Sequence, residues 1–370
     1  MKIQSILHLI AVLAVLFCAQ PASAEKYYTL DEYIENHPEE KIREDSFKKI
    51  VRRNTVKQYH NLTQPKIAFI YPGGQISDYW RRSRESFKNR LLQYGVKPEI
   101  INFPIPPSAS TAEHAVIFRK AVKTEPDFLI FTFDTRRHQR MIEPVLISGK
   151  PKIILQNITT PLKAWDNKQP FMYVGFDHAT GAKTLARYFA DKTGKQGNYA
   201  VLLPEPGYLN DVRGKTFISY MDNNTSLDLT SLFQTGINKE KARKATISIT
   251  EKHPDIKFIY ACSTDIALGA SEALKSAGLQ GKILLNGWGG GSPEIEAIKN
   301  GELDVTIMRI NDDNGVAMAD AIVLDMLGKK SQLPLVFSGR FEILVKGISE
   351  KRLQKLQQES FRYSGKPKDN

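Results

Sequence analysis

The sequence is poor in cysteine and lacks the motifs of several enzyme classes. Two cysteines among 370 residues exclude a scaffold held together by disulfides. The sequence contains no G-x-x-x-x-G-K-[ST] phosphate loop, no G-x-S-x-G nucleophile turn and no H-E-x-x-H zinc pair. The glycine-rich segment 287–291 also lacks the dinucleotide fingerprint. We therefore expect a protein that is not an enzyme, without a metal site and without a cofactor.

Long hydrophobic runs are also missing, except at the start of the chain. Lys2 precedes an apolar stretch over residues 6–17, and Ala22 and Ala24 then form the small-residue pattern of a cleavage site. That stretch is too short to span a membrane, and no later stretch reaches the roughly 18 apolar residues that a span needs. We expect residues 1–24 to be a signal peptide cleaved after Ala24, and the mature protein to lie in the periplasm without membrane insertion.

Positive charge exceeds negative charge, by +12 in the full sequence and by +11 once Lys2 is removed. Export makes a nucleic-acid partner improbable, so we interpret the excess as surface charge. Part of it forms a basic face on a helix expected over residues 77–94, which we expect to be solvated. The remaining thiol, Cys262, ends an apolar strand, so we expect it to be buried.

Two kinds of pattern divide the chain. Residues 25–65 contain many charged side chains with apolar residues at helical spacing, which predicts a helical N-terminal extension. From Lys66 on, continuous apolar strands alternate with helices in two series of comparable size. This alternation predicts an α/β fold of two doubly wound, Rossmann-like lobes with parallel sheets. Ligands of such sheets bind at the carboxyl ends of the strands, so we expect a site in the cleft between the lobes.

Short polar groups, tryptophans and arginines follow the predicted strands, and together they resemble the lining of a small, hydroxyl-rich ligand site. Taken singly, most have a structural explanation: Trp80 could belong to the core, and Thr264 could cap a helix. Arg213 and Arg309 are harder to explain, because a buried arginine needs an anionic or polar partner. The candidate ligand-binding residues are Gln75, Ser77, Trp80, Thr132, Asn157, Arg213, Thr264, Trp288 and Arg309.

Several long segments around these residues resemble a known family. Behind a signal peptide, the two-lobe pattern is similar to type I periplasmic binding proteins of the ribose/galactose kind, and more closely to the LuxP family of periplasmic autoinducer 2 receptors. The segments that carry the resemblance are 71–80 (YPGGQISDYW), 155–161 (LQNITTP), 173–178 (YVGFDH), 260–265 (YACSTD), 286–292 (NGWGGGS) and 308–313 (MRINDD).

This resemblance implies lobes joined by a three-segment hinge, with residues 66–175 plus 310–337 in one lobe and residues 176–309 plus 338–370 in the other lobe and tail. It also implies a ligand, autoinducer 2 as a furanosyl borate diester. Arg213 and Arg309 match residues that face the borate. Hydrogen bonds to the ring would come from the residues matching at Gln75, Ser77, Thr132, Asn157 and Thr264. Trp80 and Trp288 match tryptophans that supply wall and polar contact.

The same resemblance implies quorum sensing as the function: the receptor relays ligand occupancy to the periplasmic domain of a LuxQ-like membrane sensor histidine kinase. An alternative stays open, namely the sugar-binding component of an ABC importer. Sugar sites tend to place carboxylates against hydroxyls, and Asp134 and Asp265 leave this alternative open. An enzyme is a third hypothesis, which we rank last because no nucleophile–base pair is evident.

Overall fold

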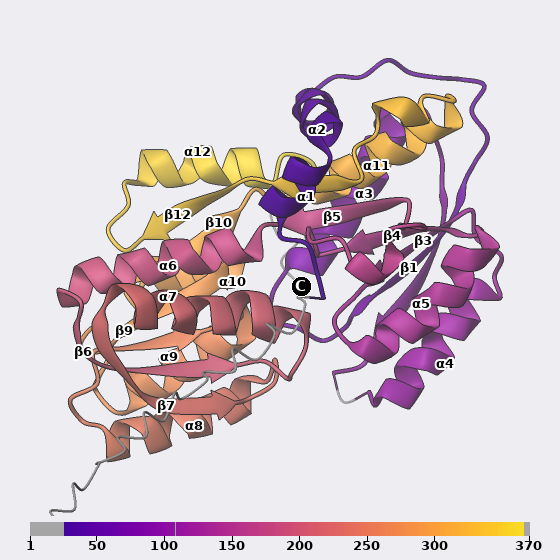
Figure 1. Ribbon diagram of the computed structural model, residues 1–370. Coiled ribbons are helices and arrows are strands. Elements are labelled where there is room, and N and C mark those ends of the chain that lie inside the picture. The colour runs from indigo at the N-terminus through magenta and orange to yellow at the C-terminus, as the bar shows by residue number, and fades with distance from the viewer. Residues whose placement is uncertain (1–25, 108, 366–370) are drawn as a thin grey trace, which may run out of the picture.

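The computed structural model describes residues 26–107 and 109–365, which fold into two α/β lobes lying side by side (Figure 1). The signal peptide expected over residues 1–24 lies outside the described residues. Within the described part of the chain, no helix is long and apolar enough to cross a membrane.

Each lobe is built on a six-stranded sheet. The first sheet has the order β11-β5-β4-β3-β1-β2, and all of its neighbouring strands are parallel. Its strands are β1 (Lys66–Pro72), β2 (Glu99–Ile105), β3 (Phe128–Thr132), β4 (Lys152–Gln156), β5 (Met172–Phe176) and β11 (Val336–Gly339). The sequence prediction of a parallel sheet is confirmed.

The second sheet has the order β12-β10-β9-β8-β6-β7, in which only the pair β10–β12 is antiparallel. Its strands are β6 (Gln196–Leu203), β7 (Ser226–Gln234), β8 (Phe258–Ala261), β9 (Leu284–Gly289), β10 (Val305–Arg309) and β12 (Phe341–Val345). The chain passes between the two sheets three times: after β5, after β10 and between β11 and β12. This is the expected hinge of three segments.

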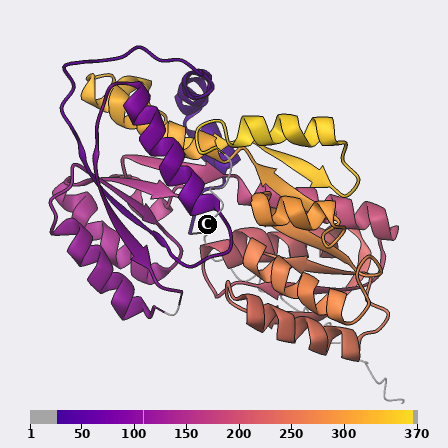
Figure 2. The same cartoon turned by 180° about the vertical axis from the view of Figure 1, so that it is seen from behind.

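Helices cover both faces of each sheet, as the views from the two sides show (Figures 1 and 2). The helices are α1 (Leu30–Asn36), α2 (Pro38–Val51), α3 (Tyr79–Gln93), α4 (Thr111–Val122), α5 (Arg136–Ser148), α6 (His178–Thr193), α7 (Thr216–Asn224), α8 (Lys239–Lys252), α9 (Thr264–Ser276), α10 (Ser292–Lys299), α11 (Asp312–Met326) and α12 (Glu350–Ser360). Short 3-10 turns lie at Lys163–Trp165 and Lys330–Gln332, and a π-helical turn lies at Asn210–Lys215.

Successive side chains of a strand point to opposite faces of the sheet, so each face packs against different helices. In β1, Ile67 and Phe69 pack with α2, α3 and α11, whereas Ala68 and Ile70 pack with α4 and α5 on the opposite face. The second lobe has one continuous core, which includes Cys262 and the inner face of α12. Cys262 is only 1% exposed, which confirms its expected burial.

Two local expectations were wrong. The extension is helical only to Val51, and residues 52–65 run without helix. The basic face of α3 is not wholly solvated, because Arg82 and Arg90 are only 1% and 0% exposed. Asp78 pairs with Arg82, and Asp320 pairs with Arg90.

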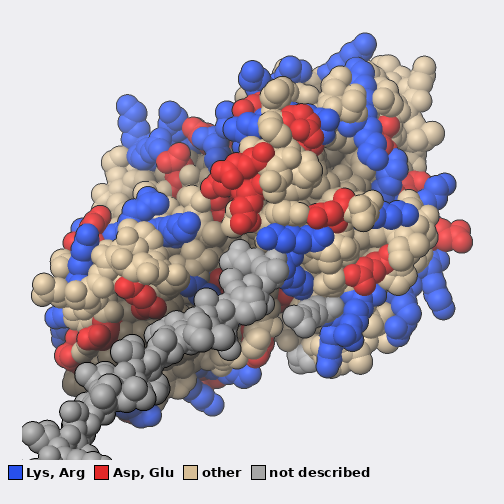
Figure 3. Space-filling model, viewed as in Figure 1, with Lys and Arg blue, Asp and Glu red and all other residues tan. Residues whose placement is uncertain are grey.

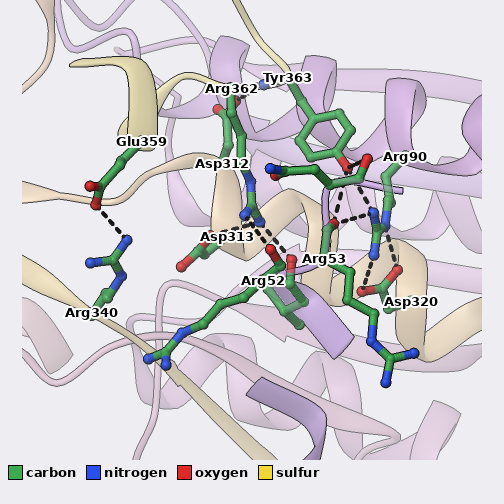
Figure 4. Close-up of polar contacts among 12 residues, drawn as sticks. Arg52, Arg53, Arg90, Asp312, Asp313, Asp320, Arg340, Glu359, Arg362 and Tyr363 are labelled. Atoms are coloured by element: carbon green, nitrogen blue, oxygen red, sulfur yellow. Dashed lines mark hydrogen bonds and ion pairs between the residues drawn. The ribbon is translucent and has the colours of Figure 1, made fainter. Parts of the chain in front are cut away.

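Residues 361–364 connect the second lobe back to the first. After α12, which packs on the second lobe, they return to α3 and α11 of the first lobe (Figure 4). Tyr363 and Ser364 donate their backbone N–H groups to Asp312 Oδ2, both at 2.7 Å. Buried carboxylates of α11 thus anchor this segment.

Candidate functional site

The candidate residues come together where the carboxyl ends of the two sheets face each other. The lobes touch here directly: the N–H of Ile76, after β1, donates to Asp265 Oδ1 in α9 at 2.9 Å. On another side of the cleft, the N–H of Leu209 in the second lobe donates to Asp134 Oδ1, after β3, at 3.2 Å. The structure therefore describes a closed cleft.

Arg213 lies in the π-helical turn and is almost fully enclosed, at 3% exposure. Its Nη1 donates to the carbonyl of Cys262 at 2.8 Å, and its guanidinium lies 4.1 Å from the centre of the Trp288 ring. Burial, together with the nearby positive charge of Arg309, lowers the pKa of Arg213 to about 10. Burying this cation without a carboxylate partner thus disfavours its charged form.

Arg309 ends β10 at 4% exposure, and its guanidinium lies 4.1 Å from the centre of the Tyr79 ring. Its Nε is buried and has no hydrogen-bond partner among the described residues. Burial lowers its pKa as well. The neighbouring Glu294 carboxylate is already occupied by the N–H groups of Trp288 and Gly290, at 2.8 and 2.7 Å. Two cations thus face the cleft without an anion of their own.

Two neutral candidates also carry buried atoms without partners. The side-chain oxygens Thr132 Oγ1 and Asn157 Oδ1 have none among the described residues. Asn157 has a φ of +66°, a left-handed conformation that the backbone holds because its N–H donates to the carbonyl of Val174 at 2.7 Å. Unsatisfied buried polar atoms are rare in folded proteins, so their concentration here indicates a ligand site.

The loop after β1 brings Gln75, Ser77 and Trp80 to the same edge. The indole N–H of Trp80 donates to Gln75 Oε1 at 3.0 Å, and Ser77 is half-buried. In the second lobe, Thr264 Oγ1 donates to the carbonyl of Trp288 at 3.2 Å. Direct contacts thus join Gln75 with Trp80 in the first lobe, and Arg213 and Thr264 with Trp288 in the second.

The indole N–H groups of both candidate tryptophans have protein partners. The indole N–H of Trp288 donates to the Tyr260 hydroxyl at 2.9 Å, and that of Trp80 donates to Gln75. These bonds fix the orientation of each ring and leave its apolar faces for other contacts.

His178 was not among the candidates, yet it connects two of them. It is 1% exposed, its Nε2 lies 3.2 Å from the carbonyl of Asn157, and its Nδ1 lies 3.3 Å from Arg213 Nη2. Burial and the charge of Arg213 hold the pKa of His178 well below its usual value. A neutral ring can donate from Nε2 and accept at Nδ1, so His178 orients both residues. Its position directly after a strand could have revealed it.

Tyr79 is a second residue that sequence reasoning missed. Its hydroxyl accepts from Asn314 Nδ2 at 2.9 Å, and its ring lies under Arg309. The sequence pattern pointed to the neighbouring Trp80, whereas in the structure Tyr79 contacts Arg309 directly.

A separate hollow of about 670 Å³ lies on the first lobe, between α2 and residues 330–335. Basic side chains line it, but each of three has a partner: Arg43 pairs with Glu40, Lys152 with Asp325, and Lys168 with the carbonyl of Ile147. It therefore lacks the unpartnered polar atoms that distinguish the cleft.

Basic and acidic side chains are interspersed over the face of the molecule shown in Figure 3. The excess of positive charge does not form a stripe of one sign on this face. The two arginines of the cleft are thus better candidates for recognising an anion than the visible surface.

Comparison with solved structures confirms the two-lobe fold. A solute-binding protein of an ABC transporter from Agrobacterium vitis, bound to alpha-D-tagatopyranose, superposes with a TM-score of 0.70 at 18% identity, over 79% of this chain and 99% of that one. One from Actinobacillus succinogenes with bound D-allose gives 0.65 at 22% identity, over 79% and 100%. XylFII in a XylFII–LytSN complex gives 0.66 at 17% identity, over 77% and 98%.

Similar sequences lead to the same group. The ribose import binding protein RbsB of Bacillus subtilis is 29% identical over 160 residues, which are 43% of this chain and 51% of that protein. The match thus spans about half the length of that relative. The D-ribose/D-allose-binding protein of Pseudomonas aeruginosa is 21% identical over 239 residues, 64% of this chain and 73% of that protein. Residues 67–330 match the periplasmic binding protein domain, so the chain belongs to the periplasmic binding protein family.

Proposed function

We propose that the cleft binds a small, hydroxyl-rich ligand with one negative charge, the furanosyl borate diester of autoinducer 2. The observation that carries this proposal is the pair of buried arginines without a carboxylate, of which Arg309 has an unpartnered Nε. The free-energy cost of desolvating a buried arginine is offset only when an anion or several hydrogen-bond acceptors bind its guanidinium. A neutral sugar offsets the desolvation of two buried arginines less than an anionic borate does.

The neutral residues fit the remainder of such a ligand. Gln75, Ser77, Thr132, Asn157 and Thr264 offer amide and hydroxyl groups to ring oxygens, and Trp80 and Trp288 offer walls. The unpartnered oxygens of Thr132 and Asn157 are available to ligand hydroxyls.

We further propose that the protein is a periplasmic quorum-sensing receptor that relays occupancy to a LuxQ-like membrane sensor histidine kinase. A ligand that contacts both lobes favours the closed state by its difference in affinity for the two states. Residues 26–66 and 331–365 lie outside the family match, and exposed side chains among them, such as Ile42 at 70%, offer a surface for such a partner. XylFII, which shares the fold, also forms a complex with a second protein.

A second candidate function is sugar binding for an ABC importer, and the similar proteins favour it over signalling. The relatives are named for ribose, allose and apiose import or binding. Asp265 supports this function locally, because its Oδ2 is buried and unpartnered and could accept from a sugar hydroxyl.

Calorimetry separates the two functions. We expect autoinducer 2 to bind with borate and to bind at least about tenfold more weakly without it, since a hydrogen bond to a charged group contributes about 1.5–3 kcal/mol. D-Ribose and D-allose should bind weakly. Tight sugar binding with no effect of borate would establish the importer function instead.

A further inference from the structure

Two loops from opposite lobes meet next to the group of candidate ligand residues. The loop after β1 ends at Asp78, the residue before α3, and the loop after β9 ends at Gly291, the residue before α10. Because the first belongs to one sheet and the second to the other, a movement of the lobes apart acts directly on the contacts between them.

Three polar contacts involve these loops. Arg82 Nη2 donates to Ser292 Oγ at 3.0 Å, and the N–H of Ser292 donates to Asp78 Oδ2 at 3.3 Å. Arg82 Nε in turn donates to the same Asp78 oxygen at 2.5 Å. On the first lobe, Arg82 thus supplies a donor and Asp78 an acceptor. Both bind Ser292 of the second lobe, at its hydroxyl and its backbone N–H.

Gly291 lies close to the Asp78 carboxylate. A Cβ added to Gly291 would lie 2.2 Å from Asp78 Oδ1, which is much closer than van der Waals contact. The dihedral angles of Gly291 are φ −73° and ψ 176°, which any residue adopts. Arg82 and the N–H of Ser292 hold this carboxylate in place, so alanine at position 291 would displace it from these contacts.

The end of the chain holds Arg82 in place from behind. Its Nη1 donates to Ser364 Oγ at 3.1 Å, and its guanidinium lies 3.6 Å from the centre of the Phe361 ring. The same terminal segment is fixed to α11 through Asp312 and to the N-terminal extension through Arg362, which donates to the carbonyl of Val51 at 2.6 Å (Figure 4). These contacts hold the Arg82 guanidinium in place in the closed structure.

We propose that Asp78, Arg82, Gly291 and Ser292 form an interlobe latch that stabilises the closed cleft without belonging to the candidate ligand site. Arg82 is a positioning residue: it orients Asp78, and both then engage Ser292. The proposal rests on ligand binding between the lobes, and it adds residues that set how long the ligand stays.

The test uses two variants, Ser292→Ala and Gly291→Ala, in the full exported protein. Spin labels on Ile147→Cys and Lys244→Cys, exposed positions of the two lobes, report the distance between the lobes with and without autoinducer 2 in borate. We expect the closed population to fall in both variants. We also expect ligand affinity to decrease about three- to tenfold for Ser292→Ala and at least about tenfold for Gly291→Ala, through faster dissociation.

Ser276→Ala, at an exposed position of α9, is the matched control and should change neither distance nor affinity. The melting temperature of the unliganded variants should stay at that of the parent, which separates a latch from a folding defect. An unchanged closed population in Gly291→Ala would overturn the latch. So would the absence of a closed population in the parent protein. Failure of autoinducer 2 to bind, with a closed population that still falls in both variants, would overturn the proposed function and leave the latch supported.

Discussion

At the scale of single residues, the cleft concentrates uncompensated positive charge. Arg213 and Arg309 are buried, both pKa values are lowered by burial, and each charge opposes the other. Proteins seldom keep such a pair without a purpose, because each buried cation lowers stability until an anion arrives. The two arginines thus favour the binding of an anion and lower the stability of the ligand-free protein.

Replacing Arg309 by methionine should expose this trade-off. We expect Arg309→Met to raise the free energy of unfolding of the ligand-free protein by about 1–3 kcal/mol, because a buried unpaired charge is removed. The same variant should lose at least about tenfold in affinity for borated autoinducer 2. Urea denaturation and calorimetry measure the two effects. Arg352→Met, at a surface ion pair with Glu342, is the control and should change neither by much. A destabilised Arg309→Met would contradict the argument.

Asp134 predicts a dependence of stability on pH. Burial raises its pKa from 3.8 to about 6, although N–H donors from the second lobe oppose the shift. The folded protein therefore binds more protons than the unfolded chain between about pH 4 and 6, so the free energy of unfolding falls as pH rises through this window. Asp312, whose pKa is also raised to about 6, contributes in the same direction.

Asp134→Asn should flatten this pH dependence, since an amide cannot ionise. We expect the change in unfolding free energy between pH 4 and 6 to shrink by about 1–2 kcal/mol, less than the full shift because the carboxyl is only partly enclosed. Asp228→Asn, at an exposed position of β7, should leave the profile unchanged. A parent profile that rises with pH over this window would contradict the sign.

Position in sequence was enough to predict that the candidate residues follow strands, because the carboxyl ends of parallel strands meet at one edge of a sheet. It was not enough for Arg82 and Arg90. Their spacing along a helix is that of a solvated face, and their burial depends on Asp320 and Ser364, which lie more than 200 residues away. Partners this remote leave no trace in a local pattern.

At the scale of elements, strands were easier to predict from the sequence than the interruption of a helix. Continuous apolar runs predicted parallel strands from Lys66 on, because buried parallel strands have a simple signature. The π-helical turn Asn210–Lys215 has no such signature. In the structure this turn carries Arg213, whose Nη1 donates to the carbonyl of Cys262.

The N-terminal extension is the element whose role the sequence underestimated. In α2, Glu40 and Glu44 accept from the backbone N–H groups of Leu335 and Ser338, and Phe47 is fully buried in the core of the first lobe. The extension is therefore a part of that core and not an appendage.

We expect Phe47→Ala to lower the free energy of unfolding by about 3–5 kcal/mol, the usual cost of truncating a buried phenylalanine. Ile42→Ala is the matched control on the same helix, because Ile42 is 70% exposed. Chemical denaturation measures both. If Phe47→Ala were as mild as Ile42→Ala, α2 would be a detachable element.

At the scale of the whole molecule, closure connects the two lobes through bonds that belong to neither core. Backbone N–H groups of one lobe donate to carboxylates or carbonyls of the other at both sides of the cleft. These amides lose their partners when the hinge opens, whereas amides in the strands keep theirs. Hydrogen exchange can therefore separate hinge motion from unfolding.

The interlobe donors are Ile76, Tyr208, Leu209 and Ser292. We expect a saturating ligand to slow exchange at these amides by at least about tenfold, because it shifts the population toward the closed state. Exchange at Leu129 and Ile259, buried in β3 and β8, should reflect global stability alone and change by a common factor. Full protection of the four amides before ligand is added would contradict ligand-driven closure. Mass spectrometry of the unliganded and liganded protein at one pH makes the comparison.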